Sequence, residues 1–161
     1  MEKLNYCSYC ANPLDFKDKH YYCHNCNKTV YFDPKVAVAS IITKKKSAIL
    51  LVKRAIGPSI GKWSFPSGFV DRGERLENAL IREVREEINL LVKVTDLIGV
   101  YSYQDNPVIL CAFEAEVLSG EIRMNDEISG IKEFSLEELP NLAFKHDRQI
   151  INDWKKIKNV N

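Results

Sequence analysis

The sequence lacks the features that define several classes of protein. No apolar run in its 161 residues approaches the length of a membrane-spanning helix, and the start, Met1-Glu2-Lys3, lacks a signal-peptide core. Neither sign of charge is in excess, because 23 Lys and Arg against 22 Asp and Glu leave a net charge of +1. That balance gives no general attraction to nucleic acid or to an anionic membrane. We therefore expect a cytoplasmic protein, with no membrane partner and no nucleic-acid partner.

Length and composition indicate a globular chain with one main core. Its 45% hydrophobic and 28% charged residues are typical of folded domains. A length of 161 residues suffices for one compact domain with a small appendage. The composition changes at Asp33-Pro34: Cys, Tyr, Asn and Lys are frequent before it, and apolar periodicity begins after it. We predict a small module at 1–33 and a larger domain at 34–161.

The five cysteines are unevenly placed. Four form two pairs near the N-terminus, Cys7-x2-Cys10 and Cys23-x2-Cys26, and the fifth, Cys111, lies in an apolar run. An odd number of cysteines without a secretion signal argues against a disulfide framework. Two such knuckles can meet around one Zn²⁺ with tetrahedral thiolate geometry, which leaves no open position for catalysis. We predict a structural zinc ribbon that folds on its metal, and a buried core thiol at Cys111.

Hydrophobic periodicity predicts mixed secondary structure in the larger domain. Two segments have helical spacing of apolar residues, 76–88 and 146–158, and the apolar stripe of the second ends at Ile157. Strands are predicted at 36–43, 48–54, 63–70, 91–103, 108–118, 121–124 and 131–134. The lysine run 44–46 is typical of a solvent-facing hairpin turn between the first two strands. This pattern favours an α/β sandwich built on a mixed sheet.

Three glutamates crowd one side of the helix predicted at 76–88. Glu83 and Glu87 lie one turn apart and Glu86 borders them, so like charges at this spacing are unfavourable without a cation. Arg82, four residues before Glu86, can offset the charge repulsion at Glu86, whereas the helix spacing leaves Glu83 with no basic neighbour. All-oxygen ligands suit Mg²⁺ or Mn²⁺ rather than zinc. The helix alone leaves a merely solvated acidic face as the alternative.

The loop before this helix helps to decide between a metal site and a solvated acidic face. Gly68 and Gly73 free the backbone for a tight loop that leads into a helix N-terminus. Loop and helix together resemble the box of the Nudix family: Gly, five residues, Glu, seven residues, then Arg-Glu-aliphatic-x-Glu-Glu-x-Gly-aliphatic. Eight of these nine positions are matched, at Gly68, Glu74, Arg82, Glu83, Val84, Glu86, Glu87 and Leu90. The ninth is Asn89, and Asn best replaces Gly in the left-handed conformation that ends a helix.

The resemblance covers the chain from about Val36 to the C-terminus and implies an α/β/α sandwich whose box forms a loop–helix–loop. It implies that Glu83 and Glu87 are primary ligands of Mg²⁺ or Mn²⁺. Glu86 would be a further ligand or would assist the attacking water. The backbone carbonyl of Ser67 would add a ligand.

The same resemblance gives roles to residues that flank the metal ligands. Glu74 and Arg82 would pair and, with Gly68, brace the loop. Family members often add an acid from a downstream loop, for which Glu127 is the first candidate and Asp126 the second. A surface acid without a function stays open as the alternative for Glu127. The implied catalytic set is then Glu86, Glu87 and Glu127, acting on a water that bound Mg²⁺ acidifies for in-line attack on phosphorus.

The four-cysteine ribbon and the box together resemble the zinc-ribbon branch of Nudix hydrolases, which includes NADH diphosphatases and smaller enzymes acting on ADP-ribose or FAD. The NADH diphosphatases carry a Ser-Gln-Pro-Trp-Pro-Phe-Pro stretch after the box, and 91–111 contains nothing like it. The resemblance therefore favours a small nucleotide substrate, ADP-ribose or a related dinucleotide such as FAD, and release of a nucleoside monophosphate. Two alternatives stay open: a nucleotide-binding sensor module and a decapping-type RNA-processing hydrolase. A homodimer is compatible with the resemblance.

Overall fold

The computed structural model describes residues 5–18, 20–31, 33–43 and 48–159. The chain divides into two compact units. The first comprises Met1–Pro34 together with Gln104–Pro107, and the second comprises Lys35–Tyr103 together with Val108–Asn161. Each unit has a hydrophobic cluster of its own, so the two are described separately.

The smaller unit is a three-stranded antiparallel sheet. Its strands follow the chain in the order β1 (Asp15–Lys17), β2 (His20–Cys23) and β3 (Lys28–Val30). The only hydrophobic residues buried in it, among those described, are Cys7, Cys23 and Val30. A core of this size is too small to hold a fold by apolar burial alone.

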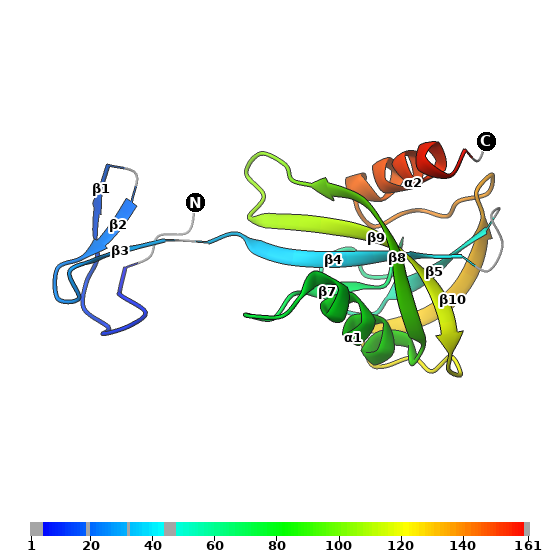
Figure 1. Cartoon of the computed structure of the whole chain (residues 1–161), viewed down its shortest axis with the longest axis horizontal. Coiled ribbons are helices and arrows are strands. Elements are labelled where there is room, and N and C mark those ends of the chain that lie inside the picture. Colours follow the sequence, from blue (N-terminus) through cyan, green and yellow to red (C-terminus); the bar gives the residue numbers. More distant parts are fainter. Residues whose placement is uncertain (1–4, 19, 32, 44–47, 160–161) are drawn as a thin grey trace. The chain divides into compact units, whose positions relative to one another are not determined.

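The larger unit contains a four-stranded mixed sheet in the order β7-β4-β9-β8 (Figure 1). Its central strands β4 (Lys35–Ile42) and β9 (Val108–Ser119) run parallel. The outer strands β7 (Ser67–Phe69) and β8 (Leu91–Tyr101) pair antiparallel with them. Runs of β-branched and aliphatic residues, buried on both faces, account for the two central strands.

A second sheet has the order β10-β5-β6. It is formed by β10 (Ile128–Ser135), β5 (Ala48–Arg54) and β6 (Trp63–Ser64), all antiparallel. The predicted hairpin between β4 and β5 is therefore wrong, because these consecutive strands belong to different sheets. The lysine run 44–46, predicted as its turn, lies outside the described residues. The strand predicted at 121–124 is absent as well, since this stretch is irregular.

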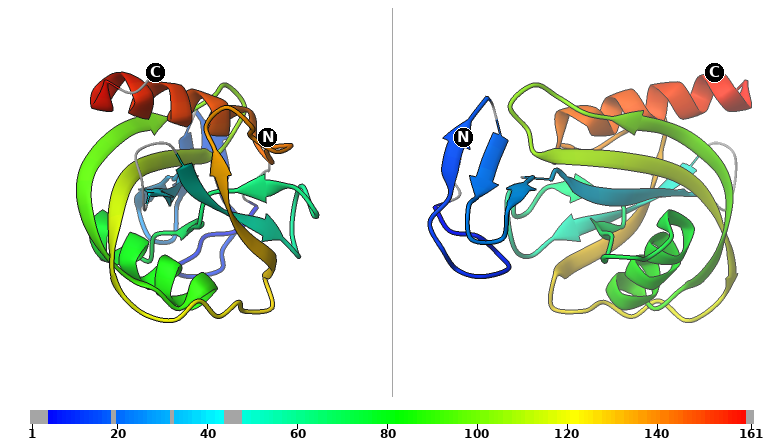
Figure 2. Two further views of the ribbon diagram at one scale, coloured as in Figure 1. Left: turned by 90° about the vertical axis from the view of Figure 1, so that its right-hand side faces the viewer. Right: turned by 60° about the vertical axis from the view of Figure 1, so that its left-hand side comes forward.

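Helices α1 (Leu76–Ile88) and α2 (Lys145–Lys158) lie on opposite sides of the strands, as Figures 1 and 2 show. Alternate residues of β4 serve the two sides: Val38 packs in the cluster of α1, whereas Ile41 packs in the cluster of α2. This confirms the predicted α/β/α sandwich on a mixed sheet. The apolar stripe of α2 is shorter than predicted, because Ile157 is 49% exposed. Neither helix, within the part of the chain described, has the length and apolar character needed to cross a membrane.

Candidate active site

A short loop leads from β7 into α1 and is closed by its own hydrogen bonds. The N–H of Glu74 donates to the carbonyl of Asp71 (3.0 Å), and the N–H of Asp71 donates to Glu74 Oε2 (3.1 Å). Gly73 has φ +84°, a conformation that favours glycine. At the far end of the helix Asn89 is left-handed (φ 58°) and its N–H reaches the carbonyl of Arg85. This confirms that Asn89 replaces Gly as the residue that ends the helix.

Gly68 is required for a reason other than the predicted loop freedom. It lies within β7, opposite Val38 of β4, and its backbone is not left-handed. A Cβ on Gly68 would lie 1.9 Å from Cδ of Glu83. The carboxyl of Glu83 therefore rests directly on the backbone of Gly68, and a Cβ at this position would displace it.

Arg82 is the centre of an ion-pair network that holds the loop to the helix. Its Nε and Nη2 donate to the two carboxylate oxygens of Glu74 at 3.0 and 2.9 Å, a bidentate pair. Nη2 also donates to the carbonyl of Phe69 (3.0 Å). Nη1 donates to Glu83 (2.8 Å) and Glu86 (3.2 Å). The Arg82 hydrogen bonds lower the pKa of Glu74.

This network corrects one step of the sequence reasoning. Helix spacing gave Arg82 to Glu86 and left Glu83 without a basic neighbour. In the structure Arg82 reaches both, because the side chains of adjacent residues 82 and 83 converge over β7. The crowding of the three glutamates is thus partly relieved by one guanidinium.

Glu87 is the most deeply buried of the helix acids, at 5% exposure. Its pKa is raised to about 8, mainly by burial and in smaller part by the negative charges of Glu83 and Glu127, whereas the hydrogen bond from the N–H of Ser67 lowers it. That N–H donates to Glu87 Oε2 at 3.2 Å. Burial also raises the pKa of Glu83. Two poorly hydrated carboxylates side by side are the arrangement that a bound cation would stabilise.

Glu127 reaches the helix acids from the loop that follows β9. Its charge acts on both Glu83 and Glu87, although its own side chain is exposed. The N–H of Ala55 donates to the carbonyl of Glu127 (2.7 Å) and the N–H of Asn125 donates to that of Glu87 (3.2 Å), which fixes the loop beside the helix. Asp126, the second candidate, is exposed and acts on neither acid in any recorded contact.

The acids do not converge as closely as a filled metal site would. Among the described residues, only the four cysteines form a group of three or more potential ligands with all ligand atoms within 4.8 Å of one another. Glu83 and Glu86 instead turn an oxygen toward Arg82. Their chemistry nevertheless fits a hard cation, since every side-chain donor is a carboxylate oxygen. Small rotations away from Arg82 are what metal binding would require.

Arg54 is a cation of this region that the sequence reasoning missed. It ends β5, and its charge opposes the upward shift in the pKa of Glu87. Its Nε donates to the carbonyl of Pro58 (2.9 Å) and its Nη2 to that of Ile56 (3.5 Å). No partner of Nη1 is recorded among the described residues. The strand pattern alone gave no signal for this role, because Glu87, on which the charge of Arg54 acts, is distant in sequence.

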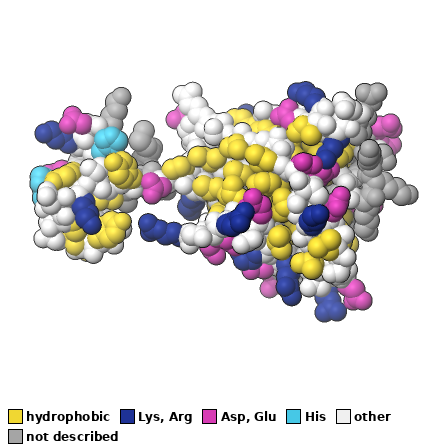
Figure 3. Space-filling model, in the orientation of Figure 1, with side chains coloured by type: hydrophobic (Ala, Val, Ile, Leu, Met, Phe, Trp, Pro, Cys, Tyr) yellow, Lys and Arg dark blue, Asp and Glu magenta, His cyan; other side chains and the backbone are white. Residues whose placement is uncertain are grey.

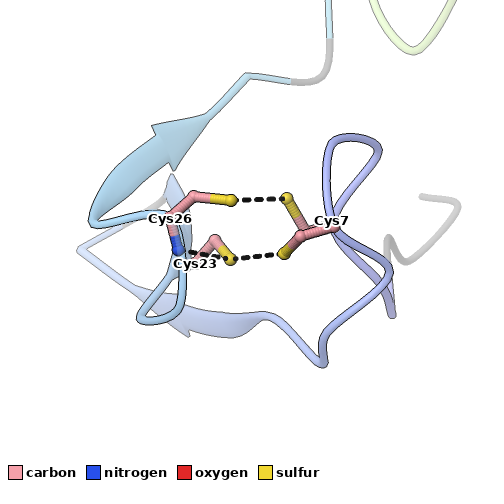
Figure 4. Close-up of side chains that lie close together, drawn as sticks. Cys7, Cys23 and Cys26 are labelled. Atoms are coloured by element: carbon pink, nitrogen blue, oxygen red, sulfur yellow. Dashed lines mark hydrogen bonds between the residues drawn. The ribbon is translucent and has the colours of Figure 1, made fainter.

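The cysteines of the smaller unit converge in two pairs (Figure 4). Sγ of Cys7 lies 4.0 Å from that of Cys26, and Sγ of Cys10 lies 3.5 Å from that of Cys23. The backbone N–H of Asn12 is the main cause that lowers the pKa of Cys10 to about 6. Hydrogen bonding to Cys10 is the main cause that raises that of Cys26 to about 12.

The neighbouring histidine does not add a ligand to this cluster of four sulfurs. His24 is turned away and contacts Asp15 instead, at 2.8 Å. Four thiols this close, in a unit with so small a core, fit a tetrahedral zinc site. Cys111, by contrast, is buried in the larger unit, as predicted, and this burial raises the pKa of its thiol.

Comparisons with a family model, with related sequences and with solved structures all point to the same family. The family model described as "NUDIX domain" matches residues 33–154. The ADP-ribose pyrophosphatase of Methanocaldococcus jannaschii is 42% identical over 134 residues, which cover 81% of this chain and 78% of that protein. The NAD-capped RNA hydrolase NudC of Pseudomonas putida is 31% identical over 140 residues, 85% of this chain and half of that one. A NUDIX hydrolase from Nitrosomonas europaea has a similar structure (TM-score 0.84, 28% identity, 98% and 94% of the two chains).

Proposed function

This chain belongs to the Nudix hydrolase family, and we propose that it hydrolyses the phosphoanhydride bond of ADP-ribose or a related dinucleotide such as FAD with Mg²⁺ or Mn²⁺. A nucleoside monophosphate would be released. The observation that carries the proposal is the acidic surface of α1: Glu87 is buried, Glu83 is half-buried with its carboxyl against Gly68, and the charge of Glu127 acts on both. Family membership supports the coarser statement, hydrolysis of a nucleotide-linked phosphoanhydride.

Each residue of the site has a proposed task. Glu83, Glu86 and Glu87, with the carbonyl of Ser67, would hold the divalent cation, which neutralises the diphosphate and acidifies a bound water. Glu86, Glu87 or Glu127 would take the proton of that water. Glu74 and Arg82 would not touch the substrate; their bidentate ion pair would keep the loop against the helix.

Arg54 adds a positive charge at the edge of these acids. We propose that its Nη1, which has no hydrogen-bond partner among the described residues, donates to a phosphate oxygen of the substrate, because guanidinium groups bind phosphate with directional hydrogen bonds. The two backbone carbonyls that accept from Arg54 already orient the group before substrate arrives. Little side-chain entropy is then lost on binding.

ADP-ribose is the preferred substrate on two grounds. The relative that is 42% identical bears the name ADP-ribose pyrophosphatase, and this chain spans most of its length. The stretch typical of NADH diphosphatases is also missing from 91–111. Base and sugar selectivity would then come from loops around the acids rather than from the box.

Hydrolysis of NAD-capped RNA is the second candidate. Relatives named NudC support it at about 31% identity, but this chain spans only half of their length. The net charge of +1 gives no general attraction to RNA. On the face of the larger unit drawn in Figure 3, Lys and Arg are interspersed with Asp and Glu rather than gathered in one basic patch. We therefore rank this reading below a small dinucleotide.

The zinc ribbon is proposed as a folding element. Cys7, Cys10, Cys23 and Cys26 would bind one Zn²⁺ and so replace the apolar core that the smaller unit lacks. All four positions of the metal would be filled by thiolate, so the ribbon would take no part in the chemistry.

A substrate panel tests the proposal. Purified zinc-replete protein is assayed with Mg²⁺ on ADP-ribose, FAD, NADH, diadenosine polyphosphates, nucleoside triphosphates and a short NAD-capped RNA, with products resolved by chromatography. We expect AMP from ADP-ribose or FAD. Activity on capped RNA alone would favour the second candidate. No hydrolysis of any substrate in the panel would contradict both candidate functions and favour a nucleotide sensor.

A further inference from the structure

Asp147, in the first turn of α2, is a buried carboxylate that the proposed chemistry does not use. It is 2% exposed, and its Oδ2 accepts the N–H of Phe144 at 2.9 Å. Burial raises its pKa to about 7, against the backbone N–H of Phe144, the charge of Arg54 and the N–H of Ala143. Burial of an ionised carboxylate costs free energy, so a residue of this kind is a candidate for a functional role.

Two titratable groups act on Asp147 among the described residues. His146 of α2 lies 3.6 Å from its Oδ1, but burial lowers the pKa of this imidazole, so it is neutral at pH 7. The remaining one is Arg54 of β5, whose positive charge acts on Asp147. The same charge acts on a second buried acid, Glu87.

Asp147 and Arg54 are also linked through an aromatic residue that contacts both. The guanidinium carbon of Arg54 lies 5.3 Å from the ring centre of Phe144, the residue whose N–H Asp147 binds. On the ring side, Phe144 stacks on His146 at 5.1 Å with 16° between the planes. On the backbone side, the N–H of Ala143 donates to the carbonyl of Trp63 (2.7 Å). The ring is thus fixed from several directions, and its position depends on the Asp147 cap.

From these contacts we propose that Asp147 is a positioning residue for Arg54. By its hydrogen bond to Phe144, whose ring lies against the guanidinium, and by its charge, it holds Arg54 in place to bind the diphosphate of a nucleoside diphosphate substrate. Asp147 itself does not touch substrate. The inference rests on the proposed function, because it gives Arg54 the task of binding that diphosphate.

The variant Asp147→Asn separates charge from packing. The amide keeps the shape and an oxygen acceptor for the N–H of Phe144, and it removes the charge that holds Arg54. Asp153→Asn is the matched control: it is the same change on the same helix, at an acid whose contacts are Tyr101 and Lys156 instead. Thermal unfolding of all variants confirms that they fold.

The decisive measurement is a double-mutant cycle with Arg54→Ala, using ADP-ribose and Mg²⁺. Residues in one network are strongly non-additive. We expect Asp147→Asn to lower kcat/KM about tenfold, mostly through KM, and to change it less than twofold when Arg54 is already Ala. Asp153→Asn should stay within twofold of wild type. Losses that multiply in the double variant, or an Asp147→Asn enzyme with normal KM, would overturn the proposal.

A second readout needs no substrate and keeps the inference separate from the proposed function. The Nε–H signal of Arg54, identified by its loss in Arg54→Ala, is followed by NMR hydrogen exchange. Its bond to the carbonyl of Pro58 should protect it in the wild-type protein. We expect exchange to be several-fold faster in Asp147→Asn and unchanged in Asp153→Asn. Equal exchange in all three would show that Asp147 does not hold Arg54, whatever the substrate proves to be.

Discussion

Replacement of the buried carboxylate Glu87 by an amide, Glu87→Gln, should stabilise the metal-free protein at alkaline pH while it abolishes turnover. Glu87 is 5% exposed, and burial raises its pKa from an ordinary value of 4.5 to about 8. Above pH 8 the wild-type fold must hold an ionised carboxylate where water hardly reaches. The amide stays neutral and still offers an oxygen to the N–H of Ser67.

The sign and size follow from proton linkage. Because the pKa of Glu87 is higher in the folded than in the unfolded state, the folded protein binds more protons between pH 4.5 and about 8. The stability of the wild type therefore falls as the pH rises through that window. The full difference corresponds to about 5 kcal/mol at 1.36 kcal/mol per pKa unit. We expect the advantage of Glu87→Gln to be near zero at pH 4 and to approach that value at pH 9.

Urea unfolding at pH 5, 7 and 9 measures this difference. Tryptophan fluorescence is the probe, since both tryptophans, Trp63 and Trp154, lie in the larger unit. Buffers are freed of Mg²⁺ on a chelating resin, without soluble chelator, so that zinc is retained. Mg²⁺ at 100 times its Kd should then restore about 2.7 kcal/mol to the wild type and nothing to the variant. A wild type at least as stable as Glu87→Gln at pH 9 would refute the reasoning.

Three further predictions concern the loop and the ribbon. Gly68→Ala should lower kcat/KM about 100-fold with little change in fold, because the added Cβ displaces the Glu83 carboxyl by an ångström or more; normal kinetics would contradict the packing. Arg82→Lys keeps the charge but loses the fork to Glu74, so we expect about 1.5–3 kcal/mol less stability by urea unfolding at pH 7. That loss should shrink as the pH falls below 4.5, because the lowered pKa of Glu74 makes the pair stabilising only while the carboxylate is ionised. Cys23→Ser should abolish the binding of about one zinc ion per chain, measured by elemental analysis; retained zinc would place the metal elsewhere.

Local patterns in the sequence predicted the helix and its end well. The helix predicted at 76–88 has those bounds in the structure, and Asn89 ends it in the left-handed conformation. Both are properties of short stretches: apolar residues at helical spacing, and a residue type that tolerates positive φ. The burial of Cys111 was equally local, since it lies within an apolar strand.

Long-range pairing is what local patterns could not supply. The two strands that flank the lysine run looked like a hairpin, but β4 pairs in parallel with β9, some 70 residues further along the chain. Arg54 shows the same limit: its charge acts on Glu87 of α1 and Asp147 of α2, and no pattern within β5 predicts this. Helix spacing also missed the pair of Arg82 with Glu83, because that contact depends on how both side chains bend over β7.

The central claim is that the acids of α1 hold the catalytic cation. It is tested most directly by the Mg²⁺-dependent turnover of ADP-ribose in Glu83→Gln, with Glu77→Gln as the matched control on the same helix. Among the described residues the ion-pair partner of Glu77 is Arg75, and the charge of Glu77 is not among the causes that shift the pKa of Glu83 or Glu87. We predict that Glu83→Gln lowers kcat by at least about 100-fold with the fold intact, and that Glu77→Gln stays within twofold of wild type. Near-normal turnover in Glu83→Gln, or equal losses in both variants, would contradict the account.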